Sequence, residues 1–187
     1  MDIQKLYGID RHMVEWVNQH RIKPLDNLFI FITDTAYITA VVIALLVLCI
    51  ALYINRKSLK IKAAQMVTAL VANTIVITLL KFTINRERPY VHDPLIVKLT
   101  SGGSPSFPSG HTADAFVIAM SFTLLFSDKI FLNILIWLWV LAVAYSRVVL
   151  GVHYVSDVIG SAIIGSLIAI IVNKFFTNKY NYNMTTL

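Results

Sequence analysis

Three segments of the chain carry side chains whose types suit the cleavage of a phosphate ester. They are Lys81 with Arg88-Pro89, Pro108-Ser109-Gly110-His111, and Ser146-Arg147 with His153 and Asp157. Cations stabilise the oxygens of a transferring phosphoryl group, one imidazole can attack phosphorus, and a second can protonate the leaving oxygen. If the fold brings the segments together, this inventory predicts phosphoryl transfer.

His153 and Asp157 are spaced i, i+4, which on a helix places the carboxylate beside one imidazole nitrogen. The carboxylate then fixes the tautomer and leaves the other nitrogen as a base or nucleophile. A purely structural His–Asp pair is the alternative. Since the pair lies at the start of the apolar run 154–176, where ionisable groups are costly and usually functional, we favour catalysis.

The cations of the first and third segments are candidate phosphate ligands. Lys81 and Arg88 are seven residues apart, so on one helix they would share a face two turns apart. Pro89 is expected to end that helix and to favour an extended conformation at Arg88. Arg147 adds a guanidinium, which can hold two phosphate oxygens at once. Snorkelling to a membrane surface is the alternative for cations at the end of a span.

The segment that begins at Pro108 adds hydrogen-bond donors and a second imidazole. Ser109 and Gly110 precede an apolar helix, so their backbone N–H groups are predicted to bind an anion at its positive end. Helix capping by Ser109 is the alternative. His111 lies at the start of the same helix. Asp114, one turn later, either pairs with a pocket cation, tunes His111, or faces water.

No metal site is predicted near these segments, because the carboxylates lack ligand spacing to the histidines and three cations would repel a divalent ion. These carboxylates are Glu87, Asp93, Asp114 and Asp157. Arg86, Tyr90 and His92 also lie near the first segment. We interpret them as solvated loop residues rather than contacts of a substrate headgroup.

The composition of the chain is that of an integral membrane protein. Of its 187 residues, 57% are hydrophobic and only 14% are charged, whereas soluble domains carry about 25% charged residues. The net charge of +6 is spread between apolar blocks, which favours anionic headgroups or phosphate-bearing substrates over nucleic acid. Cys49 is the single cysteine, so no internal disulfide forms.

Five apolar runs approach the length of about 20 residues that a helix needs to cross a bilayer. They are 36–54, 63–82, 108–127, 130–145 and 154–176. None alternates like a membrane barrel strand. The predicted fold class is therefore all-α, a polytopic transmembrane helical bundle of five to six spans occupying residues 28–176, with a C-terminal tail over 177–187.

Residues 1–27 form a separate N-terminal segment in this prediction. Ile9, Met13 and Trp16 follow helical spacing, so the segment is an amphipathic helix that lies on the membrane surface or caps the bundle. The first loop after it carries Arg56, Lys57, Lys60 and Lys62, which predicts that this loop is cytoplasmic. Alternation of the spans then places all three chemical segments on the periplasmic or extracellular side.

Taken together, the three segments match a known signature without substitution: Lys-x6-Arg-Pro, Pro-Ser-Gly-His and Ser-Arg-x5-His-x3-Asp. The chain resembles the type 2 phosphatidic acid phosphatase superfamily of membrane lipid phosphatases over about residues 28–176. Members of that superfamily usually have six spans, one more than we count. This difference affects the predicted path of the N-terminal segment and leaves the site residues unchanged.

The resemblance implies a role for each matching residue. His153 would attack phosphorus and become a phosphohistidine, Asp157 would orient it, and His111 would protonate the leaving oxygen. The residues implied to bind phosphate are Lys81, Arg88, Ser109, Gly110 and Arg147. Asp114 is not part of the signature. The resemblance implies no metal and no cofactor.

The predicted function is hydrolysis of a lipid phosphate or diphosphate at the outer leaflet of a bacterial cell (inner) membrane. The small single bundle looks similar to undecaprenyl-diphosphate phosphatases, so undecaprenyl diphosphate is the predicted substrate. Phosphatidylglycerophosphate, phosphatidic acid and lipid A phosphates stay open, because all would share one phosphate pocket. Transfer to an alcohol acceptor and a non-catalytic anionic-lipid transporter are alternatives of other classes. The expected partners are the lipid substrate and membrane lipids, not nucleic acid.

Overall fold

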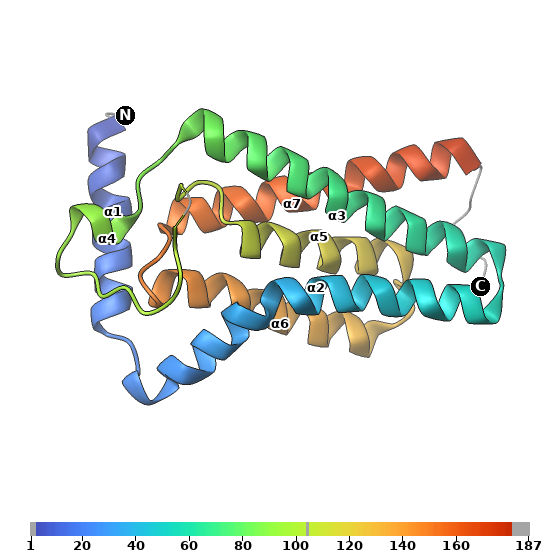
Figure 1. Cartoon of the computed structure of the whole chain (residues 1–187), viewed down its shortest axis with the longest axis horizontal. Helices are drawn as coiled ribbons and strands as arrows, with labels where there is room; N and C mark the ends of the chain where they lie inside the picture. Colours follow the sequence, from blue (N-terminus) through green and yellow to red (C-terminus); the bar gives the residue numbers. More distant parts are fainter. Residues whose placement is uncertain (1–2, 104, 181–187) are drawn as a thin grey trace.

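The computed structural model describes residues 3–103 and 105–180, and no strand occurs among them. The helices are α1 (Ile3–Gln19), α2 (Asp26–Ile54), α3 (Lys57–Ile84), α4 (Pro89–His92), α5 (Gly110–Leu125), α6 (Ile130–Val149) and α7 (Val155–Tyr180), with a 3-10 turn at Lys23–Leu25. All but α1 and α4 run along the long axis of one bundle (Figure 1). The predicted all-α membrane bundle is confirmed.

In the described part of the chain, four helices are long and apolar enough to cross a membrane: α2, α3, α6 and α7. The third predicted span, 108–127, corresponds to the helix α5, which has 16 residues and falls short of the usual length of about 20. This helix is the centre of the bundle and packs against all four of the others. Irregular backbone at membrane depth is tolerated where protein or a cavity surrounds it. The loop before α5 can therefore replace the missing turns.

The central helix makes its most extensive contact with α7. A Cβ atom at Gly165 would lie 2.5 Å from the carbonyl oxygen of Ala113, so a glycine is needed for the two backbones to approach this closely. A hydrogen bond of 2.6 Å from Gln65 Nε2 to Asn173 Oδ1 also joins α3 to α7 inside the bundle. Close backbone packing at small residues and hydrogen bonds between uncharged side chains thus hold these helices together.

Lys62 lies inside this bundle rather than in the first loop. Its side chain is buried, and Nζ donates a hydrogen bond of 2.6 Å to the carbonyl oxygen of Leu125, the last residue of α5. A cation at this position satisfies an unpaired carbonyl at the helix C-terminus. The loop charge used to predict topology is therefore carried by the exposed residues Arg56, Lys57 and Lys60.

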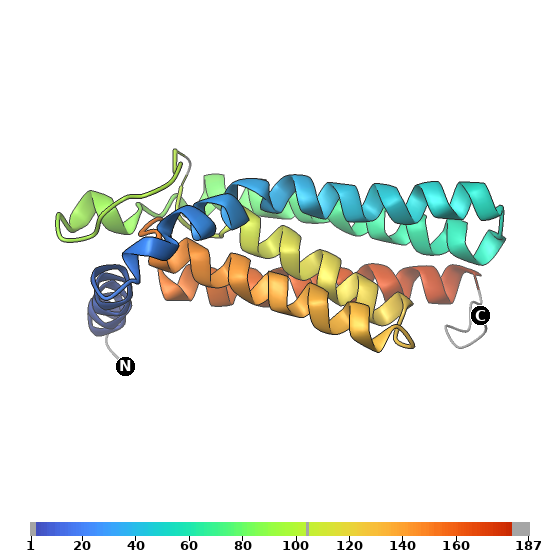
Figure 2. The same cartoon turned by 90° about the horizontal axis from the view of Figure 1, so that it is seen from below.

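The N-terminal helix α1 crosses one end of the bundle, and Figure 2 shows it end-on. Val14 and Asn18 are buried on its inner side, where Asn18 Nδ2 donates to the carbonyl oxygens of Val97 (3.0 Å) and Val149 (2.8 Å). Its outer side exposes the apolar residues Ile9, Met13 and Trp16. The helix therefore caps the bundle through one face and keeps the other apolar, as a helix at a membrane surface would.

The helices extend slightly beyond the predicted membrane region. α2 begins at Asp26, two residues before the predicted boundary at 28, and α7 continues to Tyr180, into the predicted tail. Residues 181–187, the rest of that tail, lie outside the described residues.

Candidate active site

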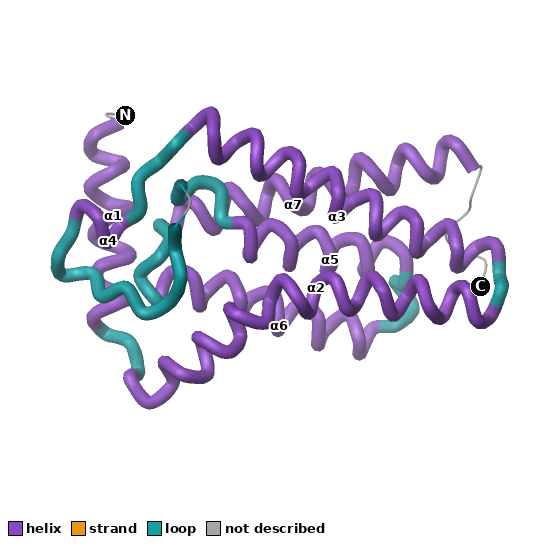
Figure 3. Tube along the Cα trace, in the orientation of Figure 1, coloured by secondary structure: helices purple, strands orange, loops and turns teal. Residues whose placement is uncertain are grey.

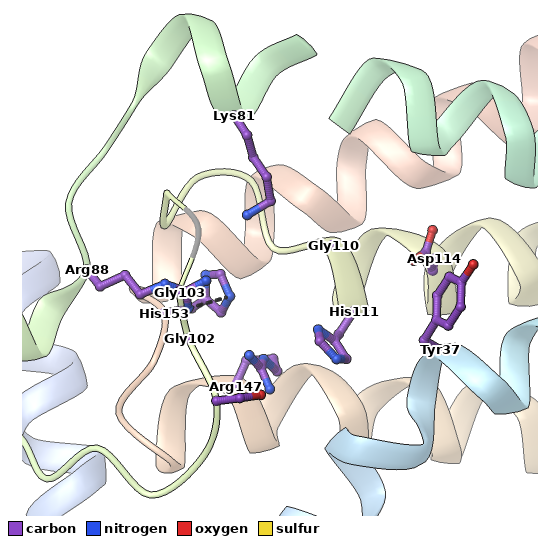
Figure 4. A pocket seen from close by; sticks show the side chains of 11 residues that line it. Tyr37, Lys81, Arg88, Gly102, Gly103, Gly110, His111, Asp114, Arg147 and His153 are labelled. Atoms are coloured by element: carbon purple, nitrogen blue, oxygen red, sulfur yellow. Dashed lines mark hydrogen bonds between the residues drawn. The ribbon is translucent and has the colours of Figure 1, made fainter. Parts of the chain in front are cut away.

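The three chemical segments meet at the end of the bundle that α1 crosses, where most of the loops also gather (Figure 3). A cavity of about 430 Å³ opens at this end. It is lined by Tyr37, Lys81, Arg88, Ser101, Gly102, Gly103, Gly110, His111, Asp114, Arg147 and His153. Figure 4 shows the lysine, the two arginines and the two histidines converging on it from different helices and loops.

Lys81 and Arg88 reach the cavity from different elements, so the prediction that they share a helix face is wrong. α3 ends at Ile84, and Asn85 adopts a left-handed conformation (φ 46°) as its C-cap. Asparagine is second only to glycine at such caps, and this is the signal that the spacing argument missed. Arg88 is extended (φ −83°, ψ 153°) directly before Pro89, as expected.

Both cations are held by loop carbonyl groups. Lys81 Nζ donates to the carbonyl oxygen of Pro105 at 2.7 Å, and Arg88 Nη1 donates to that of Val152 at 2.7 Å. A Cβ atom at Gly102 would lie 3.0 Å from Arg88 Nη1, so the glycine lets the loop cross closely over the guanidinium. The site is therefore built by folding the loop before α5 over the ends of α3 and α6.

His153 precedes α7 instead of lying on its face, which corrects the helical interpretation of the His–Asp spacing. Asp157, the third residue of α7, accepts a hydrogen bond of 3.0 Å from the backbone N–H of Tyr154, which is one half of a capping box. The same oxygen lies 3.5 Å from His153 Nδ1. The other ring nitrogen, Nε2, lies 3.2 Å from Arg88 Nη1, one of the groups that line the cavity.

The protonation state of His153 follows from its surroundings. The residue is buried, and burial holds the pKa of its imidazole below the usual value. Asp157 opposes this shift, while the positive charges of Arg147 and Arg88 add to it. The imidazole is therefore neutral near pH 7, with a lone pair on one nitrogen, which is the form that can act as a nucleophile.

Arg147 is fully buried in α6 and faces the cavity (Figure 4). Its Nη1 donates a hydrogen bond to Thr33 Oγ1 of α2, whereas its Nε has no partner among the described residues. A buried cation that keeps an unused donor is costly unless a ligand supplies the acceptor. His111 enters the same cavity from the first turn of α5.

The other predicted residues of the second segment divide between the cavity and the helix packing. Gly110 lines the cavity. Ser109 is buried behind it, where its N–H donates to Ser161 Oγ at 2.6 Å and its Oγ lies 3.0 Å from Thr112 Oγ1. Its role as a phosphate ligand stays a prediction. Asp114 lines the cavity farther along α5 and accepts a hydrogen bond of 2.7 Å from Asn73 Nδ2.

Arg86 is the polar residue at this site whose role the sequence did not reveal. Instead of being solvated in a loop, it donates to Asp157 Oδ1 at 2.5 Å and to Asp10 Oδ2 at 2.8 Å, with only 13% of its side chain exposed. No local pattern predicts a contact between residues 76 positions apart. His92 does stay exposed, where its ring contacts the Glu87 carboxylate.

Within residues 3–103 and 105–180, no three His, Cys, Asp or Glu side chains come together in a way that could hold a metal ion. The groups that meet in the cavity are instead cations and imidazoles. The independence of the reaction from metal ions stays a prediction, which rests on this excess of positive charge.

Comparison with known proteins agrees with this geometry. The family model described as the PAP2 superfamily matches residues 62–181. The undecaprenyl-diphosphatase BcrC of Bacillus subtilis (strain 168) is 30% identical over 157 residues, which cover 83% of this chain and 77% of that protein. A lipid A 4'-phosphatase of Bacteroides thetaiotaomicron is 40% identical over 81 residues, but these cover 43% of this chain and only 36% of that protein.

The fold has a counterpart among solved structures. The crystal structure of the first transmembrane PAP2 type phosphatidylglycerolphosphate phosphatase from Bacillus subtilis superposes with a TM-score of 0.77 and 24% identity, covering 97% of this chain and 90% of that one. This likeness shows the fold alone. The family match over more than half of the chain, with the signature side chains gathered at one end of the bundle, shows that the protein belongs to the type 2 phosphatidic acid phosphatase superfamily and is a lipid phosphatase.

Proposed function

We propose that the protein hydrolyses a lipid diphosphate through a phosphohistidine at His153. The observation that carries this proposal is the placement of the ring, with Asp157 at Nδ1 and the cationic cavity at Nε2. Nε2 forms a bond to phosphorus while the bond from phosphorus to the leaving oxygen breaks, and His111 gives that oxygen a proton. Neutral His111 then takes a proton from water, whose oxygen displaces His153 and releases inorganic phosphate.

The cations of the cavity have the task of stabilising the transition state. Lys81, Arg88 and Arg147 would hold the equatorial oxygens, on which negative charge is spread as the phosphoryl group transfers. Arg88 Nη1 lies 3.2 Å from His153 Nε2, so the same donor is placed to contact an oxygen on the phosphorus that this nitrogen attacks. Gly110 lines the same cavity and would add a backbone donor at the N-terminus of α5.

A second, apolar cavity supports a lipid as the rest of the substrate. It has a volume of about 210 Å³ and lies between α2 and α3, lined by Tyr37, Ala40, Val41, Ala44, Leu45, Val67, Leu70, Val71, Thr74 and Asp114. Tyr37 and Asp114 line both cavities. A substrate whose phosphate occupies the polar cavity can therefore extend its hydrocarbon chain between these two helices.

We infer that the physiological substrate is undecaprenyl diphosphate. The relative of this activity aligns over three quarters of its own length, and three cations in one cavity suit a diphosphate, which brings more negative charge than a monoester. Phosphatidylglycerophosphate, phosphatidic acid and lipid A phosphates are the competing substrates.

The test measures phosphate release by the detergent-purified protein from each of these four lipids. The highest kcat/KM is expected with undecaprenyl diphosphate, and a clear preference for another lipid would reassign the substrate. Adding glycerol as an alcohol acceptor distinguishes a transferase, because the phosphoryl group would then appear on the alcohol instead of as free phosphate. Binding without release of phosphate from any lipid would point to a transporter and would contradict the proposal.

Metal removal is expected to leave the activity unchanged, because the cavity supplies its positive charge from side chains. Phosphate release should therefore be the same before and after dialysis against EDTA. Vanadate, which adopts the five-coordinate geometry of phosphoryl transfer, should inhibit. Strict dependence on added Mg²⁺ would contradict this prediction.

The active site is expected to face the periplasmic or extracellular side of a bacterial cell membrane. The turn that carries Arg56 lies at the end of the bundle opposite the site (Figure 1), and its cations favour a cytoplasmic position for that end. In a Cys49→Ala background, Ser101→Cys at the cavity should react with a membrane-impermeant maleimide in intact cells. Ser58→Cys should react only after permeabilisation. The reverse pattern would place the substrate in the cytoplasmic leaflet.

A further inference from the structure

We propose that Asp10, on the N-terminal helix α1, is a positioning residue that holds the catalytic pair His153–Asp157 through Arg86. The inference rests on the proposed function, because it takes His153 as the nucleophile. It gives α1 a part in the reaction beyond capping the bundle.

Arg86 bridges two carboxylates that are far apart in the chain. Its Nη2 lies 2.8 Å from Asp10 Oδ2, and its Nη1 lies 2.5 Å from Asp157 Oδ1. Because the guanidinium is planar, holding one nitrogen sets the direction of the other. Stacking fixes the plane as well, since the Arg86 Cζ atom lies 3.8 Å from the ring centroid of Tyr154. Ser156 closes the arrangement by accepting from Arg86 Nη1 at 2.7 Å while its Oγ donates to Asp10.

The bridge gives the two oxygens of Asp157 separate tasks. Oδ1 faces Arg86, whereas Oδ2 accepts hydrogen bonds from Ser106 Oγ and from the backbone N–H of Tyr154 and lies 3.5 Å from His153 Nδ1. If Arg86 turned away, the carboxylate would lose the contact that fixes its Oδ1, and only the two hydrogen bonds to Oδ2 would keep that oxygen toward the imidazole. Asp10 is the charged partner that holds the far side of Arg86 in place.

Charge balance gives a second reason for Asp10. The Asp157 carboxylate is fully buried, and the side chains of Arg86 and Asp10 are only 13% and 12% exposed, so their charges are weakly screened. One guanidinium shared by two carboxylates leaves a negative charge to face the imidazole, which becomes positive as His153 bonds to phosphorus. With Asp10 neutral, Arg86 would cancel the charge of Asp157. The transition state would then lose stabilisation even if the geometry stayed the same.

The attachment of α1 to the bundle does not depend on Asp10 alone, which allows its charge to be tested separately from docking. Arg11 forms an ion pair with Asp93 (2.8 Å), and Asn18 is hydrogen-bonded to two carbonyl groups on neighbouring segments. Asp93→Asn is therefore a matched control, because it makes the same carboxylate-to-amide change in the other ion pair of α1.

The experiment measures kcat and KM for Asp10→Asn with the fastest of the four lipids tested above. We expect kcat to fall about tenfold while KM stays close to the wild-type value, since contacting groups in one network are coupled at this scale. Asp10→Glu, which keeps the charge, should recover part of the loss. Asp93→Asn should keep the wild-type kcat. Equal losses in Asp10→Asn and Asp93→Asn would show that docking of α1 is what matters and would overturn the proposal.

A double-mutant cycle tests whether Asp10 acts through Arg86. Arg86→Ala should lower kcat, and adding Asp10→Asn to it should lower kcat no further; independent, additive losses would overturn the proposal. The inhibition constant of inorganic phosphate is measured for every variant, and a wild-type value shows that the cavity is still folded. If Arg86→Ala fails this check, Asp10→Asn alone tests the proposal. The proposed function is tested by a different variant: phosphate release by His153→Ala would contradict it. Wild-type kcat in Asp10→Asn with an inactive His153→Ala refutes the positioning role alone.

Discussion

His153→Ala is expected to lower phosphate release by about 10⁶-fold, the scale on which removal of the nucleophile acts in enzymes with covalent intermediates. The reason is geometric: of the two imidazoles that line the cavity, His153 is the one with a buried carboxylate at its other nitrogen. Rapid quench with labelled lipid should trap an acid-labile phosphoenzyme in the wild type and none in the variant.

The matched control for this substitution is His92→Ala, which removes an exposed histidine that does not line the cavity. It should keep wild-type turnover and form the same phosphoenzyme. Substantial turnover by His153→Ala, or a phosphoenzyme in that variant, would refute the assignment of the nucleophile.

His111→Ala is expected to cost about 10²–10⁴-fold with a lipid phosphate, the usual contribution of a general acid. His111 lies in the first turn of α5 and points into the cavity (Figure 4), so it is placed to protonate the leaving oxygen. A good leaving group needs no proton. The loss should therefore be much smaller with p-nitrophenyl phosphate than with a lipid phosphomonoester such as phosphatidic acid, whose leaving group is an alcohol.

The measurement is the ratio of kcat/KM for wild type and variant with each of the two substrates. Phosphoenzyme should still form in His111→Ala with p-nitrophenyl phosphate, because His153 is intact, while its hydrolysis should slow as the general base is lost. An equal loss with both substrates would show that His111 does not act on the leaving group.

Much of the fold followed from apolar runs, because a helix that crosses lipid must satisfy its own backbone and therefore needs an unbroken apolar stretch. The long helices α2, α3, α6 and α7 were visible in this way. The short α5 was also located, but its length was overestimated. The predicted span ran from 108 to 127, whereas the helix runs from Gly110 to Leu125, two residues shorter at each end.

Local conformation at the site was less predictable than its residues. A left-handed Asn85 ends α3 three residues after Lys81, and a capping interaction of Asp157 starts α7 after His153. Both details moved a side chain off the helix on which spacing had placed it. Each depends on one backbone turn, and residue spacing carries no information on such turns.

Sequence alone was enough to identify the membrane bundle and the family, and to predict most of the residues that line the cavity, because hydropathy and signature spacing are properties of the chain order. The contacts that align those residues could not be predicted from the sequence. Arg86 meets Asp10 and Asp157 across 76 and 71 positions, and Arg147 meets Thr33 across 114. Such pairs form when helices distant in sequence pack side by side, so their partners are set by the packing of the whole bundle and by no local pattern.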